Sequence, residues 1–149
     1  MTNFIQPGDS VEYSNSGAAI DSGDMVAVGH RIGIALTDIA ATTGKGTVNL
    51  DGVYSLAKST SEAVAIGVQL YANTTAQTVT ATPAAGLVPC GVAHEAGAET
   101  AATVNVRLQE QPKRAAGQAN SSAVDTAAMV VDFNALLAKL RAAGIIATL

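Results

Sequence analysis

Short apolar segments alternate with turn-forming residues from the start of the chain to about Leu108. In Val104-Asn105-Val106-Arg107-Leu108 apolar and polar side chains alternate, and in Ile32-Gly33-Ile34-Ala35-Leu36 large and small side chains alternate. A period of two places the two sets of side chains on opposite faces of a β-strand. The pattern therefore predicts a β body in which one face of each strand is buried.

Nine segments of this kind are separated by turn-forming residues such as Asp51-Gly52, and Gly29-His30-Arg31 is typical of a tight hairpin. The segments are residues 10–14, 25–28, 32–37, 47–50, 53–57, 69–71, 78–82, 88–93 and 103–108. Their short connections leave no room for the helical crossovers of a parallel sheet. We therefore expect a mainly β fold, a small antiparallel β-barrel or sandwich with a C-terminal amphipathic helix.

The composition of the chain changes after Leu108. Residues 109–121 are mostly polar or small, without apolar periodicity, and predict a linker. Beyond it, Ser122 followed by Asp125 fits a capping box at the start of a helix over residues 122–143. The expected organisation is a β body (1–108) with an N-terminal arm (1–9), a linker (109–121), and a C-terminal helix with an apolar tail (122–149).

Four apolar residues of this helix, Val130, Phe133, Leu137 and Leu140, follow the spacing of a heptad seam over about two heptads. Leu136 and Val131 are expected to widen the stripe. The helix could pack on its own β body, or the linker could let it associate with copies of itself. An isolated helix of this length is only marginally stable in water, which favours self-association through the seam.

Charge and composition exclude several classes of protein. Residues 1–112 hold four basic and ten acidic residues, a net charge of −6, which opposes binding to nucleic acid. The single cysteine, Cys90, allows no internal disulfide or CxxC metal site. No apolar run is long enough for a membrane span, and the N-terminus does not resemble a signal peptide. We expect neither nucleic acid nor membrane among its partners.

Candidate chemical motifs are incomplete. Gly44-Lys45-Gly46-Thr47 lacks the preceding glycine and the following Ser or Thr of a phosphate-binding loop. His30 and His94 have no metal-binding or catalytic partner at a suitable spacing, and Asp21 and Asp24 lack the closing Glu of a calcium loop. The sequence therefore predicts no catalytic, cofactor-binding or metal-binding residues, and a protein that is not an enzyme.

Several segments, taken in order, resemble the phage capsid cement or decoration proteins. They are Asn3-Phe4-Ile5-Gln6-Pro7-Gly8-Asp9, Val11-Glu12-Tyr13, Ser22-Gly23-Asp24, Val26-Ala27-Val28-Gly29, Ile32-Gly33-Ile34-Ala35, Asp51-Gly52-Val53-Tyr54-Ser55-Leu56-Ala57-Lys58, Gly67-Val68-Gln69-Leu70-Tyr71, and Gly91-Val92-Ala93 through Val104-Asn105-Val106-Arg107-Leu108. The resemblance implies a virion protein, made in the host cytoplasm, that binds the outer capsid surface and locks neighbouring major capsid subunits together. It also implies a homotrimer near three-fold sites.

The N-terminal arm, with Phe4, Ile5 and Pro7, is the candidate capsid contact, because an extended segment can add a strand to the edge of a capsid sheet. The helical tail departs from the shortest family members, which end near the position of Leu108. An alternative function is therefore a head-fibre or adhesin base that displays a partner through the C-terminal helix.

Overall fold

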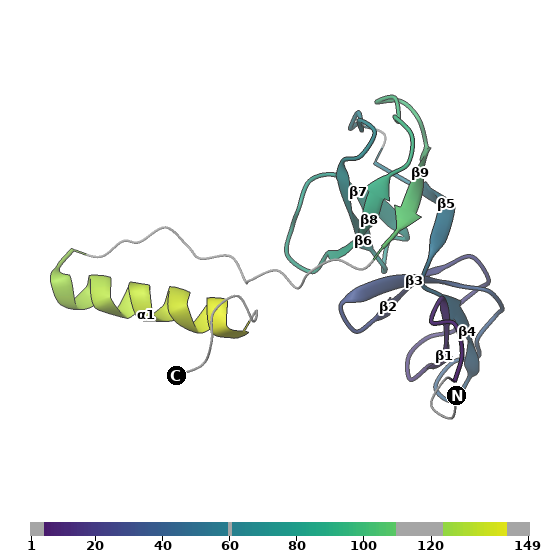
Figure 1. The fold of residues 1–149 in the computed structure, drawn as a ribbon, viewed down its shortest axis with the longest axis horizontal. Helices are drawn as coiled ribbons and strands as arrows, with labels where there is room; N and C mark the ends of the chain where they lie inside the picture. The colour runs from purple at the N-terminus through teal and green to yellow at the C-terminus, as the bar shows by residue number, and fades with distance from the viewer. Residues whose placement is uncertain (1–4, 60, 110–123, 143–149) are drawn as a thin grey trace. The chain divides into compact units, whose positions relative to one another are not determined.

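The computed structural model describes residues 5–59, 61–109 and 124–142. The chain forms two compact units, Met1–Gln111 and Pro112–Leu149. The described residues of the first unit contain nine β-strands, and those of the second contain one α-helix (Figure 1). Each of the nine segments predicted from the sequence overlaps one of these strands, so the mainly β prediction is confirmed.

The first four strands form one antiparallel sheet in the order β1-β4-β3-β2. Their bounds are β1 Ser10–Ser14, β2 Met25–Val28, β3 Arg31–Ala35 and β4 Lys45–Asn49. Gly29 and His30 form the two-residue turn between β2 and β3, as the sequence predicts. Because β1 and β2 are the edge strands, their outer sides pair with no other strand among the described residues.

The last five strands form a second antiparallel sheet in the order β5-β9-β8-β6-β7. Their bounds are β5 Gly52–Ala57, β6 Gln69–Asn73, β7 Thr78–Thr80, β8 Val88–Ala93 and β9 Thr103–Leu108. The sheet curls until Lys58, just after edge strand β5, bridges Val79 on edge strand β7. A single isolated bridge does not make a ladder, so of the two predicted architectures the packed sandwich fits and a closed barrel does not.

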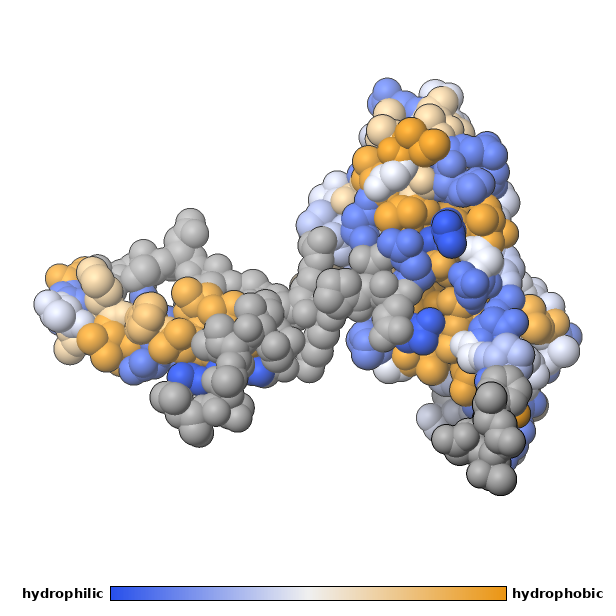
Figure 2. Space-filling view, in the orientation of Figure 1, coloured by the Kyte–Doolittle hydropathy of each residue, from blue (hydrophilic) through white to orange (hydrophobic). Residues whose placement is uncertain are grey.

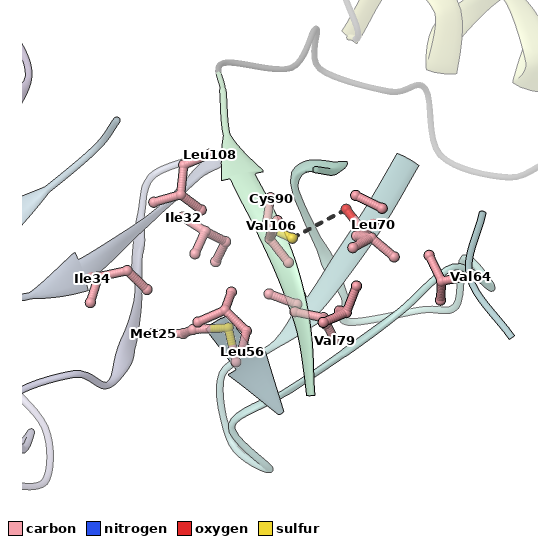
Figure 3. Close-up of a cluster of buried hydrophobic side chains, with 13 residues drawn as sticks. Met25, Ile32, Ile34, Leu56, Val64, Leu70, Val79, Cys90, Val106 and Leu108 are labelled. Carbon is pink, nitrogen blue, oxygen red and sulfur yellow. Dashed lines mark hydrogen bonds between the residues drawn. The ribbon is translucent and has the colours of Figure 1, made fainter. Parts of the chain in front are cut away.

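The main hydrophobic core joins the two sheets. Met25, Ile32 and Ile34 of the first sheet pack with the buried side chains of the second, among them Leu70 and Leu108 (Figure 3). The opposite face of the first sheet has a smaller core, formed by Val26, Ala35, Ile39, Val48 and Leu50. At β2 and β3 the first sheet is therefore apolar on both faces. This explains why the residues of β3 from Ile32 to Ala35, which point alternately to the two faces, are all apolar or small.

Side-chain amides add polar links between the sheets. The Oε1 atom of Gln77, in the turn between β6 and β7, accepts a hydrogen bond from the Met25 amide at 2.6 Å, and its Nε2 donates to the Met25 carbonyl at 3.1 Å. Gln77 thus pairs with the edge strand β2 as a neighbouring strand would. A second link joins β4 of the first sheet to β5 of the second sheet, where Asn49 Nδ2 donates a hydrogen bond to the Tyr54 hydroxyl at 2.7 Å.

Candidate functional site

The described part of the N-terminal arm lies on the surface ahead of edge strand β1. Ile5 is 87% exposed, and Pro7 is also exposed. The Gln6 Nε2 atom donates to the Ser10 carbonyl at 3.0 Å, which links the arm to the strand that follows. Phe4, the third predicted contact residue, lies outside the described residues. The arm therefore presents an apolar side chain to solvent where an extended chain enters the sheet.

The helix of the second unit, α1, spans Thr126–Ala142. Its N-cap is Asp125, whose Oδ1 atom accepts a hydrogen bond from the Ala128 amide at 2.8 Å. The predicted start near Ser122 is thus too early, because Asp125 caps the helix itself rather than occupying its third position; Ser122 lies outside the described residues. Lys139 and Arg141 lie in the last turn, where positive charge stabilises the helix dipole.

One side of α1 carries a stripe of large apolar residues, which we call the apolar stripe. At about 100° per helical residue its members fall within about 120° of arc. They are the four predicted residues Val130, Phe133, Leu137 and Leu140, together with Met129 and Leu136. Met129, Val130 and Phe133 are 61%, 53% and 58% exposed, and the three leucines are half-buried. Figure 2 shows apolar residues on the face of the helix that is in view.

The opposite side of α1 is lined by small residues. Ala128, Ala135 and Ala138 lie there, together with the exposed Val131. The prediction that Val131 widens the stripe is therefore wrong, because it lies about 100° from Val130 around the helix. Two apolar faces on opposite sides make the helix weakly amphipathic overall, although its large side chains are concentrated on one face.

Among the residues that the sequence singled out for possible chemistry, Lys45 and the two histidines lie in different elements, whereas the Asp21 amide donates a hydrogen bond to the Asp24 carboxylate at 3.0 Å within one turn. Lys45 begins β4, and its Nζ forms an exposed ion pair with Glu12 at 3.0 Å. His30 lies in the β2–β3 turn, and His94 follows β8. Among the described residues, no three His, Cys, Asp or Glu side chains come together as a metal site would require. The helix of the described part is not long and apolar enough to cross a membrane.

Cys90 is buried in the main core. Its thiol donates a hydrogen bond to the Leu70 carbonyl at 3.3 Å (Figure 3). Burial raises the pKa of Cys90 to about 12, despite a smaller opposing hydrogen-bond effect. The residue therefore remains a protonated thiol at neutral pH and serves as a small core side chain.

An open groove of about 490 Å³ lies between β2, residues 18–20 and the turn before β7. Its lining includes Met25, Val26 and Ala27 of the edge strand β2, together with Gln77. Tyr13 and Asp24 are the titratable residues among those that line it. The groove offers a sheet edge and apolar surface, and it contains no pair of groups suited to acid–base chemistry.

Lys58 is a feature that the sequence analysis did not predict. Its side chain is 4% exposed, and its Nζ donates to the carbonyls of Ser59, Glu62 and Glu99 at 2.8, 2.7 and 3.1 Å. These carbonyls come from two loops on either side of β6–β8. A buried ammonium group is tolerated because all three of its protons have acceptors. Lys58 therefore holds the two loops together.

The carboxylate of Glu62 continues this network toward β7. It accepts hydrogen bonds from the Thr80 hydroxyl, the Ala81 amide and the Thr82 hydroxyl at 2.8, 3.0 and 3.1 Å. Desolvation raises the pKa of Glu62, but these hydrogen bonds and the charge of Lys58 outweigh it, so the pKa lies below its ordinary value. The loop after β5 is thus fixed both to the loop before β9 and to the end of β7.

We expect Lys58→Met to destabilise the β body by about 2–4 kcal/mol, because three carbonyls in part-buried contacts lose their charged donor. Denaturant unfolding would measure the change in the free energy of unfolding. Lys45→Met is the matched control, because its ammonium is exposed and its ion pair with Glu12 is worth about 0–1 kcal/mol. Equal losses in the two variants would show that the buried contacts of Lys58 contribute nothing beyond a surface charge.

A scan against known protein families matches residues 5–108 to a family described as phage cement protein. Searches of curated proteins and of solved structures found no significant match. The matched segment begins in the N-terminal arm and ends with the last residue of β9, so it includes all nine strands. Since this is more than half of the chain, the chain belongs to the phage cement protein family.

Proposed function

We propose that this protein binds the outer surface of a phage capsid and stabilises contacts between major capsid subunits. The observation that carries the proposal is the family match over residues 5–108, which supports a structural role in the phage particle. The protein would be made in the host cytoplasm and would reside on the capsid surface of the virion. The major capsid protein and further copies of this chain are its proposed partners.

The properties of the β body suit such a role. Two sheets share one apolar core, and the loops at β5, β7 and β9 are fixed by Lys58 and Glu62, so the body can present a rigid surface. A capsid repeats the same binding site many times. When copies of a cement protein also contact each other, modest individual affinities give strong retention by avidity. We propose a homotrimer near three-fold sites as the bound form.

Two surfaces are proposed for these contacts. The N-terminal arm, with Phe4, Ile5 and Pro7, would add an extended strand to the capsid. The exposure of Ile5 supports this proposal, because a large apolar side chain in solvent is available for burial by a partner. The helix seam, Val130, Phe133, Leu137 and Leu140, would join copies of the chain.

Deleting residues 2–7 should lower the occupancy of capsids at least about 10-fold, because burial of Ile5 alone is worth about 1.5–3 kcal/mol. Cement-free capsids would be mixed with the variant, sedimented, and the bound protein quantified. The β body should keep its stability, since β1 begins at Ser10. Full occupancy after the deletion would refute the role of the arm.

A substitution pair provides the control for this experiment. Ile5→Ser should weaken capsid binding, whereas Ile66→Ser should not, although Ile66 is also 70% exposed. Equal binding by the two variants would indicate that the arm contributes no more than an ordinary exposed isoleucine.

One observation favours a second function, a head-fibre or adhesin base. The helix belongs to a compact unit of its own and exposes large apolar side chains, as a segment that displays a partner would. Electron microscopy of the parent virion separates the two functions. Density spread over the capsid between major capsid subunits supports cementing, and a fibre attached at isolated positions supports the alternative.

A further inference from the structure

We propose that Gln77 closes the edge strand β2 against pairing with β2 of a second copy. Its carboxamide occupies the backbone groups through which the two strands would join. This role belongs to the β body and is independent of capsid binding and of the helix. It is carried by the orientation of the β2 backbone, by the contacts of Gln77, and by the lack of other protection at this edge.

The backbone groups that β2 turns outward belong to Met25 and Ala27. The Asp24 carbonyl accepts a hydrogen bond from the Ala35 amide of β3 at 3.0 Å. The Met25 amide belongs to the same peptide unit as that carbonyl, so it points away from β3. The alternation of an antiparallel ladder gives Ala27 the same orientation as Met25. These two residues are therefore the pairing positions that β2 offers to another strand.

The side chain of Gln77 takes both pairing groups of Met25. Its Oε1 atom accepts a hydrogen bond from the Met25 amide at 2.6 Å, and its Nε2 donates to the Met25 carbonyl at 3.1 Å. Nε2 also donates to the Thr74 carbonyl at 2.7 Å, which fixes the carboxamide from its other side. The φ of Gln77 is 53°, a left-handed conformation that is uncommon for residues other than glycine. The turn thus holds the carboxamide at the edge strand despite an unfavourable backbone conformation.

The other edge strands have protection that β2 lacks. Proteins commonly shield an edge strand with charged side chains, with proline or with a covering loop. β1 carries the charged Glu12, and the edge strands β5 and β7 come together where Lys58 bridges Val79. β2 has the sequence Met-Val-Ala-Val, with neither charge nor proline. Within the part of the chain that the structure describes, Gln77 is therefore the group that blocks pairing at this edge.

The space beside β2 is open to an approaching strand. The groove of about 490 Å³ runs along this edge, and Ala27 is among its lining residues. Small residues, Ala18, Ala19, Thr74 and Thr75, also line it. Small side chains leave the backbone of the edge strand within reach. It is thus the carboxamide of Gln77, rather than a bulky wall, that stands in the way of a second strand.

Pairing between two β2 strands depends on Met25 of each copy. In an antiparallel pair centred on Val26, Met25 of one copy lies opposite Ala27 of the other, and the two residues exchange both of their backbone hydrogen bonds. Two-fold symmetry repeats this arrangement, so every such pair includes a Met25. Because Gln77 engages Met25 in each copy, none of these hydrogen bonds can form while it stays bound. Removing one side chain therefore opens all of the pairing positions together.

Gln77→Gly tests this role in the full-length chain. Glycine suits the left-handed backbone of the turn, so the substitution removes the carboxamide without adding strain. In sedimentation velocity measurements the variant should form larger species at a concentration about 10-fold lower than the unmodified chain does, because the pair gains backbone hydrogen bonds. Association through other surfaces is common to both proteins. An unchanged size distribution would overturn the proposal.

A second substitution identifies the surface that associates. Ala27→Pro removes the outward amide of β2 and leaves the hydrogen bonds to β3 in place. Gln77→Gly combined with Ala27→Pro should return to the size distribution of the unmodified chain, and Ala27→Pro alone should match it as the control. Larger species that persist in the double variant would refute pairing through β2. Their loss on deletion of residues 2–7 would make the N-terminal arm, and not β2, the occupant of the edge.

Hydrogen exchange separates this role from a simple link between the sheets. In the larger species of Gln77→Gly, the amides of both Met25 and Ala27 should exchange at least about 10-fold more slowly than the Ala27 amide of the unmodified chain, because both are paired. If Gln77 only ties the two sheets together, Gln77→Gly should instead speed exchange at Met25 and lower the stability without changing the mass. That result, or fast exchange at both amides in the larger species, would refute the proposal.

Discussion

Gly91→Ala should destabilise the β body by about 3–5 kcal/mol, the largest effect that we expect from a single methyl group in this chain. Gly91 lies in β8 opposite Leu108 of β9, and its φ of 155° is in a region that favours glycine. A Cβ atom there would overlap the Arg107 carbonyl of the neighbouring strand and lie 3.1 Å from the Leu108 Cα. Because both atoms belong to the backbone, the strands would have to separate locally.

Two glycine controls divide this loss into its causes. Gly86 has a φ of 83°, but no atom lies within 4 Å of the place that a Cβ would occupy, so Gly86→Ala tests the backbone strain alone and should cost about 1 kcal/mol. At Gly8 no atom lies within 4 Å of the place that a Cβ would occupy, and the backbone is not in the left-handed region. Gly8→Ala should therefore change the free energy of unfolding very little. Thermal or denaturant unfolding would rank the three. If Gly91→Ala cost no more than Gly86→Ala, the close approach of β9 would be of no consequence.

Local patterns in the sequence were sufficient to predict the strands. Each strand alternates between its two faces, and residues such as Gly29 and Asp51 mark the turns, so the nine segments could be located one by one. The alternation in β3 also predicted that Ile32 and Ile34 share a face, and both lie in the main core. Alternation within a segment does not reveal which strands pair with each other, because pairing joins segments that are far apart in the sequence.

Lys58 illustrates this limit. In the sequence it is a charged residue after an apolar strand, a position that is ordinarily exposed. Its burial depends on carbonyls that include Glu99, which is 41 residues away, and no local pattern indicates that contact. Gln77 is similar, because its amide pairs with Met25 across the two sheets. Long-range polar contacts of this kind are decided by the tertiary fold.

The helix was predictable for a different reason. Its spacing of large apolar residues defined the stripe, but the start was misplaced because Ser122 and Asp125 are both good N-cap residues three positions apart. The Asp125 contact with the Ala128 amide distinguishes them. The role of the stripe stays a prediction, since association between copies depends on a second molecule and not on the conformation of one chain.

Phe133→Asp combined with Leu137→Asp should abolish the contact between helices of different copies, with a rise in the dissociation constant of at least about 100-fold. Burial of each side chain is worth about 1.5–3 kcal/mol, and every 1.4 kcal/mol is a factor of ten. The new carboxylates would also have to lose hydration inside an apolar interface, which adds to the cost. Light scattering should show the mass falling to that of the species that the β bodies form alone.

The opposite face of α1 supplies the control. Val131→Asp combined with Ala135→Asp introduces the same two charges at the same spacing, at positions that are exposed and outside the apolar stripe. This variant should lose similar helix propensity but keep the mass of the unmodified chain. An unchanged mass for the Phe133 and Leu137 variant would indicate that the contact between copies lies in the β body. An equal fall in both variants would show that association needs an intact helix, without using the stripe as its interface.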